Sequence, residues 1–466
     1  MNDDLRPRRL RRAPAIRGAA ASLASLAVIL SGCSSTAPNT PATDALGPDF
    51  ETTIKVMEYA GTEQFQAVDE LVKELLAKEY PKVTLDFEYI DPETLSQRIT
   101  TAVAGENPPD IVAYFPGPDF LKLARSGALV SLTPAIEASE EMQRIADMWA
   151  ATVPPDQYMY RGDTFGFTVD LGPLSVWSWQ DQLTAAGVAG PPTTIDELIA
   201  AARAVRAAGG QPMAVGMSTE TIWEIDYTFN ALVANFDQEG QESIARRADR
   251  GALSYSEPGF RQAVELFKHL YDEGVFNDAV LEQNYQTDAK NDWSSKAVAM
   301  FWPSGPWMVQ TSPDDTVPDI NVASWPTISG DVAVLSGADK VFAGLQVTDR
   351  QKEAAHQQLI AEIARIYLSP EVQAEYYRQG LMPVDVSVAE GGAASDDPWQ
   401  VVLDKQIAMV ASADRVVDYA TYTPEIYSAI TEGIQSLLLG NSTVDKVIDG
   451  MVEAQKTAYE CAPDCE

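Results

Sequence analysis

Cysteine and histidine are scarce in this sequence. The 466-residue chain contains three cysteines, Cys33, Cys461 and Cys465, and two histidines, His269 and His356. Both histidines fall inside predicted helices without a neighbouring pattern of ligands, so a zinc site or a serine–histidine–aspartate triad has little support. The sequence also lacks G-x-x-x-x-G-K-[ST], the loop that cradles nucleotide phosphates. We therefore expect no metal, no cofactor and no ATPase activity in this chain.

Basic residues are few relative to acidic ones. The sequence has 33 Lys and Arg against 68 Asp and Glu, a formal net charge of −35. The segment before Cys33 holds six arginines and two aspartates, a net +4, so the remainder carries −39. Such a surface repels phosphate backbones and anionic lipid head groups, and we expect no nucleic-acid partner.

Residues 1–33 have the composition of an export signal. Arginines form a positive region, and residues 19–30 are an apolar run too short to span a bilayer as a stable helix. Leu30-Ser31-Gly32-Cys33 then resembles a bacterial lipobox, in which the thiol is acylated and the chain is cleaved just before it. We therefore predict lipidation at Cys33 and a protein held on the outer face of the cell membrane. A secretory signal with an incidental cysteine is the alternative, and the export route, general or twin-arginine, stays open.

The segments at the two ends of the mature chain have distinct compositions. Residues 34–49 are rich in Ser, Thr, Pro and Ala, which disfavours a packed core and suits a flexible tether. Near the other end, Cys461 and Cys465 form a C-x-x-x-C pair. In an exported protein such a pair is more often a small disulfide than a redox centre, and we expect a disulfide here.

Strand and helix patterns alternate after the tether. The length favours two or more domains. Residues 52–59 and 83–89 alternate as strands, and 111–114 is a short buried strand. Apolar residues at helical spacing separate each pair of strands. This β-α-β-α-β order implies right-handed crossovers and a parallel sheet.

Helix signals continue through the rest of the chain. Thr194 and Glu197 have the spacing of a capping box, and Gly209 ends the helix that they begin. Residues 424–439 and 443–458 are predicted as the last two helices.

Two tryptophans frame an irregular stretch late in the chain. Residues 297–301, Ala-Val-Ala-Met-Phe, suit a strand buried on both faces. Residues 302–306 then break the regular backbone, because two prolines lack a donor and a glycine tolerates positive φ. Trp307 opens the next predicted helix. Ligands sit outside the carboxyl ends of strands in open α/β sheets, so Trp302 and Trp307 are predicted at a ligand crevice.

This stretch resembles the extracellular solute-binding proteins of bacterial ABC importers, in the sugar-binding group that includes maltose-binding protein. That group has Ala-Met followed by G-x-W, and here Ala299-Met300 precedes Gly305-Pro306-Trp307. Further segments match in the right order, namely Pro109-Asp110, 121–133, 162–170, Pro192-Thr193 and 380–383. The match departs at Trp177-Ser178-Trp179-Gln180-Asp181, where the family usually has Tyr-Asn-Lys-Asp, so no polar role is carried over there.

The resemblance implies an α/β, two-lobed periplasmic-binding-protein-like fold. Each lobe would be a sheet flanked by helices, and two or three crossing segments would join the lobes. We assign 50–168 plus 342–392 to the N-terminal lobe and 169–341 plus 393–466 to the C-terminal lobe. The family further implies a monomer that delivers its ligand to ABC permease subunits with their ATPase.

A sugar receptor needs flat aromatic rings for apolar C–H faces and carboxylates for hydroxyl rims, both mostly preformed. Trp307 is the best match to the family's stacking tryptophan, and Asp170 lies where maltose-binding protein has a ligand-contacting carboxylate. The ligand-binding residues that we predict are Trp307, Trp302, Trp223, Asp170, Glu63, Asp119 and Tyr114. Core packing for the aromatic residues, and helix capping or solvation for the carboxylates, are the alternatives.

The predicted function is a lipid-anchored binding component of an importer that captures a carbohydrate, in particular an oligosaccharide, and we expect no enzyme. Two alternatives stay open. An exported glycoside hydrolase would need only a pair of carboxylates. The same fold could instead take a cationic solute such as a polyamine, which an acidic aromatic box would suit.

Overall fold

The computed structural model describes residues 46–59, 63–91, 94–105, 107–150, 153–237, 242–308, 311–391, 397–418, 422–460 and 462. The predicted signal segment, Cys33, most of the predicted tether, Cys461 and Cys465 lie outside these residues. The described residues belong to one compact unit. None of the helices in the described ranges combines the length and apolar character that a bilayer crossing needs.

The first lobe is built on a five-stranded sheet in the order β2-β1-β3-β12-β6. Its strands are β1 (Thr52–Tyr59), β2 (Val83–Ile90), β3 (Ile111–Tyr114), β6 (Gly166–Thr168) and β12 (Val341–Gly344). The first three strands are parallel, as predicted, and their bounds agree with the prediction to within one residue. β12 comes from the second half of the chain and runs antiparallel to both of its neighbours.

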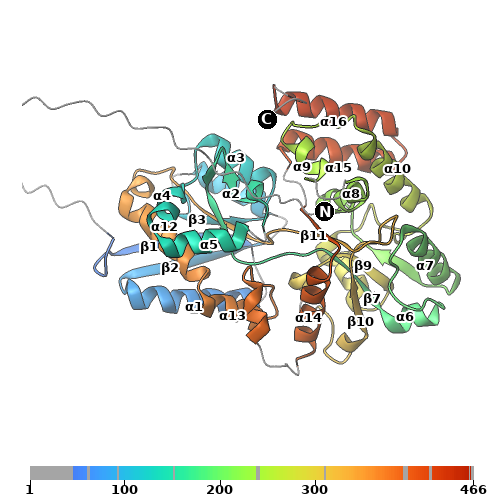
Figure 1. The fold of residues 1–466 in the computed structure, drawn as a ribbon, viewed down its shortest axis with the longest axis horizontal. Coiled ribbons are helices and arrows are strands. Elements are labelled where there is room, and N and C mark those ends of the chain that lie inside the picture. Colours follow the sequence, from blue (N-terminus) through green and yellow to red (C-terminus); the bar gives the residue numbers. More distant parts are fainter. Residues whose placement is uncertain are drawn as a thin grey trace, which may run out of the picture. The chain divides into compact units, whose positions relative to one another are not determined.

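Helices cover this sheet on its two sides. They are α1 (Glu63–Glu79), α2 (Leu95–Val103), α3 (Pro118–Ser126), α4 (Thr133–Ala138), α5 (Glu140–Ala150), α12 (Ala354–Tyr367) and α13 (Pro370–Arg378). α1 and α13 lie side by side along one side of the strands (Figure 1). Phe65, Val68 and Val72 form the buried stripe of α1, which confirms the helical spacing predicted there.

The second lobe contains a four-stranded sheet in the order β10-β7-β9-β8. Its strands are β7 (Ser175–Trp179), β8 (Gln211–Ala214), β9 (Val298–Ser304) and β10 (Ile320–Ala323). The helices around it are α6 (Gln180–Ala185), α7 (Ile195–Ala207), α8 (Trp223–Val233), α9 (Ile244–Asp249), α10 (Pro258–Asp272), α11 (Lys290–Ser294), α14 (Pro398–Ala411), α15 (Pro424–Leu438) and α16 (Val444–Ala458). Thr194 and Glu197 form the predicted capping box at the start of α7.

Short elements complete the chain. The remaining strands are β4 (Met159–Tyr160), β5 (Asp163–Thr164), β11 (Ala333–Ser336) and β13 (Arg415–Asp418). The 3₁₀ turns are η1 (Pro155–Gln157), η2 (Ala234–Phe236), η4 (Pro306–Met308), η5 (Val317–Asp319), η6 (Arg350–Lys352) and η7 (Val386–Gly391), and η3 (Tyr285–Ala289) is a π-helical turn.

The prediction of a chain break after Phe301 was wrong. β9 is fully buried, as predicted, but it continues through Trp302 and ends at Ser304. The Ser175 hydroxyl donates to the Ser304 carbonyl at 2.8 Å, and the Ser304 hydroxyl donates to the Ser175 carbonyl at 2.7 Å. These reciprocal bonds keep β9 attached to β7 beyond its proline. Trp307 therefore lies in the 3₁₀ turn η4 and does not open an α-helix.

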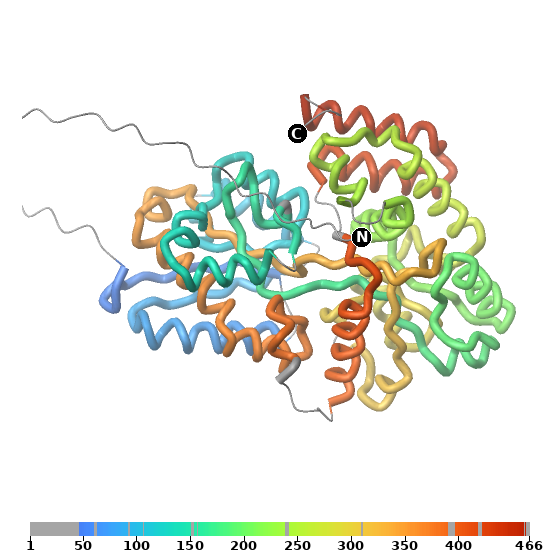
Figure 2. Tube along the Cα trace, in the orientation of Figure 1, coloured from blue at the N-terminus to red at the C-terminus, as the bar shows by residue number. Residues whose placement is uncertain are grey.

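Among the segments that carry the chain between the lobes, one runs from β6 to β7 and another from β11 to β12. They run alongside each other (Figure 2). The Gly172 amide donates to the Gly337 carbonyl at 3.0 Å, and the Lys340 amide donates to Oδ1 of Asp170 at the same distance. The crossing is thus a hydrogen-bonded pair of segments.

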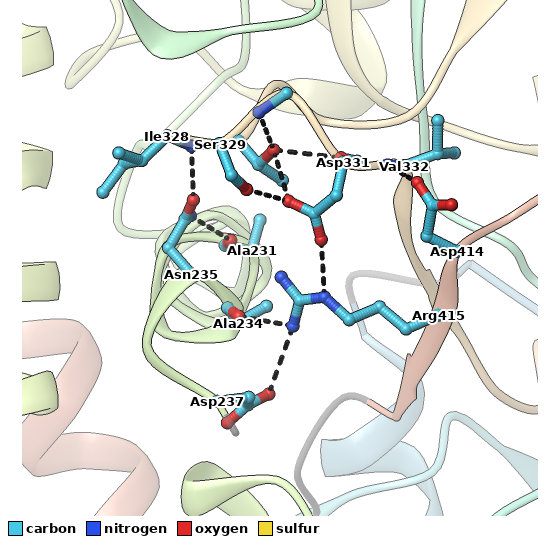
Figure 3. A network of polar contacts seen from close by, with 12 residues as sticks. Ala231, Ala234, Asn235, Asp237, Ile328, Ser329, Asp331, Val332, Asp414 and Arg415 are labelled. Carbon is cyan, nitrogen blue, oxygen red and sulfur yellow. Dashed lines mark hydrogen bonds and ion pairs between the residues drawn. The ribbon is translucent and has the colours of Figure 1, made fainter. Parts of the chain in front are cut away.

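A polar network fastens β13 to the rest of the second lobe (Figure 3). Nε of Arg415 donates to Oδ2 of Asp331 at 2.8 Å, and Nη1 donates to the Ala234 carbonyl at 2.6 Å. Burial alone would raise the pKa of Asp331, but hydrogen bonds from Ser329, Arg415 and Thr327 outweigh it and lower that pKa to about 2. The carboxylate form is therefore the one that stabilises this junction.

Candidate functional site

A cavity of about 510 Å³ is lined by residues from both lobes. Its size is typical of small-molecule sites, which measure roughly 300–1,000 Å³. Ten of its 23 lining residues are aromatic: Tyr59, Phe65, Tyr114, Phe115, Trp223, Tyr227, Tyr285, Trp307, Tyr422 and Tyr427. The charged lining residues are Asp119, Glu220, Asp226, Lys290 and Asp339.

Trp307 forms a fixed aromatic platform on the second lobe. Its Nε1 donates to Oη of Tyr285 at 2.9 Å, and that hydroxyl donates to the Pro303 carbonyl at 2.8 Å. A Cβ atom on Gly305 would overlap the six-membered part of the indole, and one on Gly172 would lie 3.2 Å from its Cζ3. The two glycines therefore let the indole pack closely on the backbone, which holds the ring in place before any ligand arrives.

Further rings extend the aromatic surface on both sides of the cavity. Trp223 meets Tyr285 edge to face, with ring centroids 4.8 Å apart. In the first lobe Tyr59 stacks on Phe115 at 4.5 Å, and Phe115 keeps 37% of its surface exposed. Both lobes thus offer flat apolar faces to the same space.

Asp339 lies on the second crossing segment, and Lys290 of α11 acts on it electrostatically. Oη of Tyr59 donates to Oδ2 of Asp339 at 3.0 Å, which links β1 of the first lobe to the second crossing. Nζ of Lys290 donates to Oε1 of Gln286 at 2.6 Å. Burial lowers the pKa of Lys290 to about 8, although Glu224 and Asp339 act in the opposite direction.

Asp226 contributes a buried carboxylate from α8, with only 6% of its surface exposed. Its Oδ1 accepts from Nδ2 of Asn230 at 3.0 Å, and Oδ1 of Asn230 accepts from the Tyr422 hydroxyl at 3.0 Å. Burial raises the pKa of Asp226 well above its ordinary value, and the Asn230 bond opposes that change.

Four of the seven residues predicted from the sequence line this cavity: Trp307, Trp223, Asp119 and Tyr114. Trp302 lies instead in the core of the second lobe and is fully buried. Its Nε1 donates to the Thr228 hydroxyl at 3.1 Å, and its ring packs on Trp325 at 4.6 Å. The alternation of side chains along β9 turns Trp302 toward α8 and away from the cavity.

The remaining two predicted residues, Asp170 and Glu63, are also absent from the cavity wall. Asp170 is 2% exposed and accepts the Lys340 amide, so it braces the crossing segments. Glu63 is the exposed first residue of α1, a position where a negative charge suits the helix dipole. Their positions give the predicted ligand roles no support.

Several lining residues were not predicted from the sequence. Tyr59 and Phe115 could have been found, because they end β1 and follow β3 at the carboxyl edge where ligands bind. Asp226, Tyr285 and Tyr427 come from helical segments whose approach to the cavity depends on packing between distant parts of the chain. Within the described residues, no group of three or more His, Cys, Asp and Glu side chains is arranged to hold a metal ion.

Comparison with known proteins places the chain among binding proteins. The sequence profile of the family described as "Bacterial extracellular solute-binding protein" matches residues 59–374. Binding proteins of Brucella abortus and Brucella suis are 24% identical over 232 residues, which are 50% of this chain. The matched region spans about half of those curated relatives, 53% of their length.

Solved structures share the fold. A chitin oligosaccharide binding protein superposes with a TM-score of 0.70 at 18% identity, over 88% of this chain and 99% of the other. The GacH receptor of Streptomyces glaucescens, solved unliganded and with acarbose, gives 0.68 at 17% identity, over 89% and 100%. A maltose/maltodextrin-binding domain from Bdellovibrio bacteriovorus bound to maltotriose gives 0.63 at 17% identity, over 87% and 99%. At these identities the likeness establishes the two-lobed fold.

Proposed function

The chain belongs to the family of bacterial extracellular solute-binding proteins, and on this premise we propose that it captures an oligosaccharide between its two lobes and delivers it to an ABC permease. Aromatic faces on both walls of one cavity are the observation that carries this proposal. Trp307 and Trp223 face it from the second lobe, and Tyr59 and Phe115 from the first. Sugar rings have apolar C–H faces that pack on such rings, and carboxylates can accept hydrogen bonds from their hydroxyls.

A ligand that touches both walls would favour closure of the lobes. Closure is a hinge motion, and the paired crossing segments are the natural hinge. The lobe assignment, 50–168 plus 342–392 and 169–341 plus 393–466, is part of this proposal. So are action as a monomer, lipidation at Cys33 and attachment to the outer face of the cell membrane.

The test is a thermal-shift screen of residues 36–466 against mono- and oligosaccharides, with polyamines and amino acids as controls. A ligand that binds only the folded state raises the melting temperature by mass action. We expect an oligosaccharide to stabilise the protein and Trp307→Ala to weaken that effect by tenfold or more in affinity. The matched control is Tyr271→Ala, because this tyrosine lies on α10 within the second lobe and does not line the cavity.

Two results would refute the proposal. If a polyamine stabilises the protein and no sugar does, the protein is a solute receptor whose ligand is a polyamine and not an oligosaccharide. Steady release of shortened oligosaccharides by the purified protein would instead identify a hydrolase.

A further inference from the structure

Acidic groups outnumber basic groups on the cavity wall. Four carboxyl groups, from Asp119, Glu220, Asp226 and Asp339, share it with one amine, from Lys290. Burial raises the pKa of Asp226 and of Asp339, so a cation beside either group would favour its ionised form. This is the first reason to ask whether the ligand itself carries positive charge.

Lys290 does not pair with every acidic side chain that lines the cavity. Its Nζ is bonded to Gln286, its ammonium lies near the Tyr285 ring, and the carboxylates that act on its pKa are Glu224 and Asp339. No basic side chain of the described residues forms an ion pair within 4.0 Å of Asp119 or Asp226. These two carboxylates therefore have no cationic partner of their own.

Asp119 and Asp226 approach the same place from different lobes. Asp119 lies in the first turn of α3, and Asp226 lies in the first turn of α8. Both line the same cavity as Tyr427 of α15, and α15 packs against α3 and α8. The two carboxyl groups therefore border one space together with Tyr427, and aromatic rings wall that space.

Tyr114 adds an independent indication that a group is missing here. Its side chain is 1% exposed and lines the cavity, yet its hydroxyl has no hydrogen-bond partner among the described residues. Asp119 is the charged residue that acts on this hydroxyl. Leaving a buried hydroxyl unpaired costs roughly 1–3 kcal/mol, so a ligand that supplies the partner gains affinity.

We infer that the ligand carries a protonated amine, held between Asp119 and Asp226 and surrounded by the aromatic rings near Tyr427. Such rings attract an ammonium group through their electron-rich faces, and desolvation strengthens the attraction. This inference rests on the proposed function and narrows it to an amine-bearing oligosaccharide. A polyamine would satisfy the same chemistry, and the experiment separates the two.

The test uses calorimetric titration of residues 36–466 at neutral pH, because burial raises the pKa of Asp226 and acid would favour its uncharged form. Four probes are compared: a glucosamine tetramer, its N-acetylated counterpart, a glucose tetramer and spermidine. The first two differ only in the charge and acylation of nitrogen. We expect the glucosamine tetramer to bind on the order of 30-fold more tightly than the N-acetylated one. This factor corresponds to about 2 kcal/mol, the lower end of the loss in binding free energy when one partner of a buried charge pair is removed.

Two neutralising variants locate the amine. Asp226→Asn and Asp119→Asn should each remove most of the preference for the amine, whereas Asp196→Asn at the exposed start of α7 should not. Asp119 is only partly buried, so its variant tests the inference even if Asp226→Asn does not fold. Equal binding by both Asp→Asn variants and the parent protein would overturn the assignment of the two carboxylates.

The probes separate failure of the inference from failure of the proposed function. If the N-acetylated or the glucose tetramer binds more tightly, the ligand needs no amine, and the proposal of a sugar receptor stands. If only spermidine binds, the ligand carries an ammonium group but is not a sugar. Absence of binding to all four probes overturns both.

Discussion

Asp331→Asn tests the network that fastens β13 to the second lobe. The parent carboxylate accepts from Arg415, Thr327 and Ser329, and its pKa is about 2 in the folded protein against an ordinary 3.8. A difference of 1.8 units corresponds to at most ~2.4 kcal/mol of folding free energy. The side chain keeps 27% of its surface in solvent, which screens the charges, so we expect about 1 kcal/mol.

The sign of the pH dependence follows from the lowered pKa. The contribution is fully present above pH 3.8 and is lost as the pH falls towards about 2, because the unfolded chain binds the proton first. Urea unfolding of the parent protein and Asp331→Asn should therefore give a gap in free energy at pH 7 that narrows below pH 4. Asp86→Asn, an exposed change on β2, is the control. A gap that stays constant from neutral to acidic pH would refute this account of the network.

Three further changes test the packing around the site. Gly305→Ala should push on the Trp307 ring, lower the free energy of unfolding by about 1–3 kcal/mol and weaken ligand binding, measured by urea unfolding and calorimetry. Trp302→Phe should cost about 1 kcal/mol through the lost bond to Thr228 while ligand affinity stays unchanged, because the indole is outside the cavity. Thr194→Ala should remove the capping box and lower stability by about 1 kcal/mol in the same unfolding assay.

The first lobe could be predicted closely from the sequence because its signals are local. Residues 52–59 alternate between faces, and β1 has those bounds. The parallel pairing of β1, β2 and β3 follows from the helices between them, since a short crossover helix permits no other simple topology. By contrast, β12 reaches this sheet from more than 170 positions beyond β6, and no local pattern marks its neighbours. Only the lobe assignment implied by the family resemblance, which changes lobe between residues 341 and 342, indicated that the chain returns to the first lobe here.

The two central tryptophans show where sequence reasoning about the site reaches its limit. Trp302 and Trp307 are both large, both close to prolines and both near the end of one predicted strand. These local features therefore predict the same location for the two side chains. Their positions differ because β9 continues to Ser304, which keeps Trp302 in the strand's alternation and sends it into the core. Continuation of β9 depends on the reciprocal bonds with Ser175, a residue 129 positions away in the chain. A contact of that kind is absent from any local window of sequence, and it decides which indole lines the cavity.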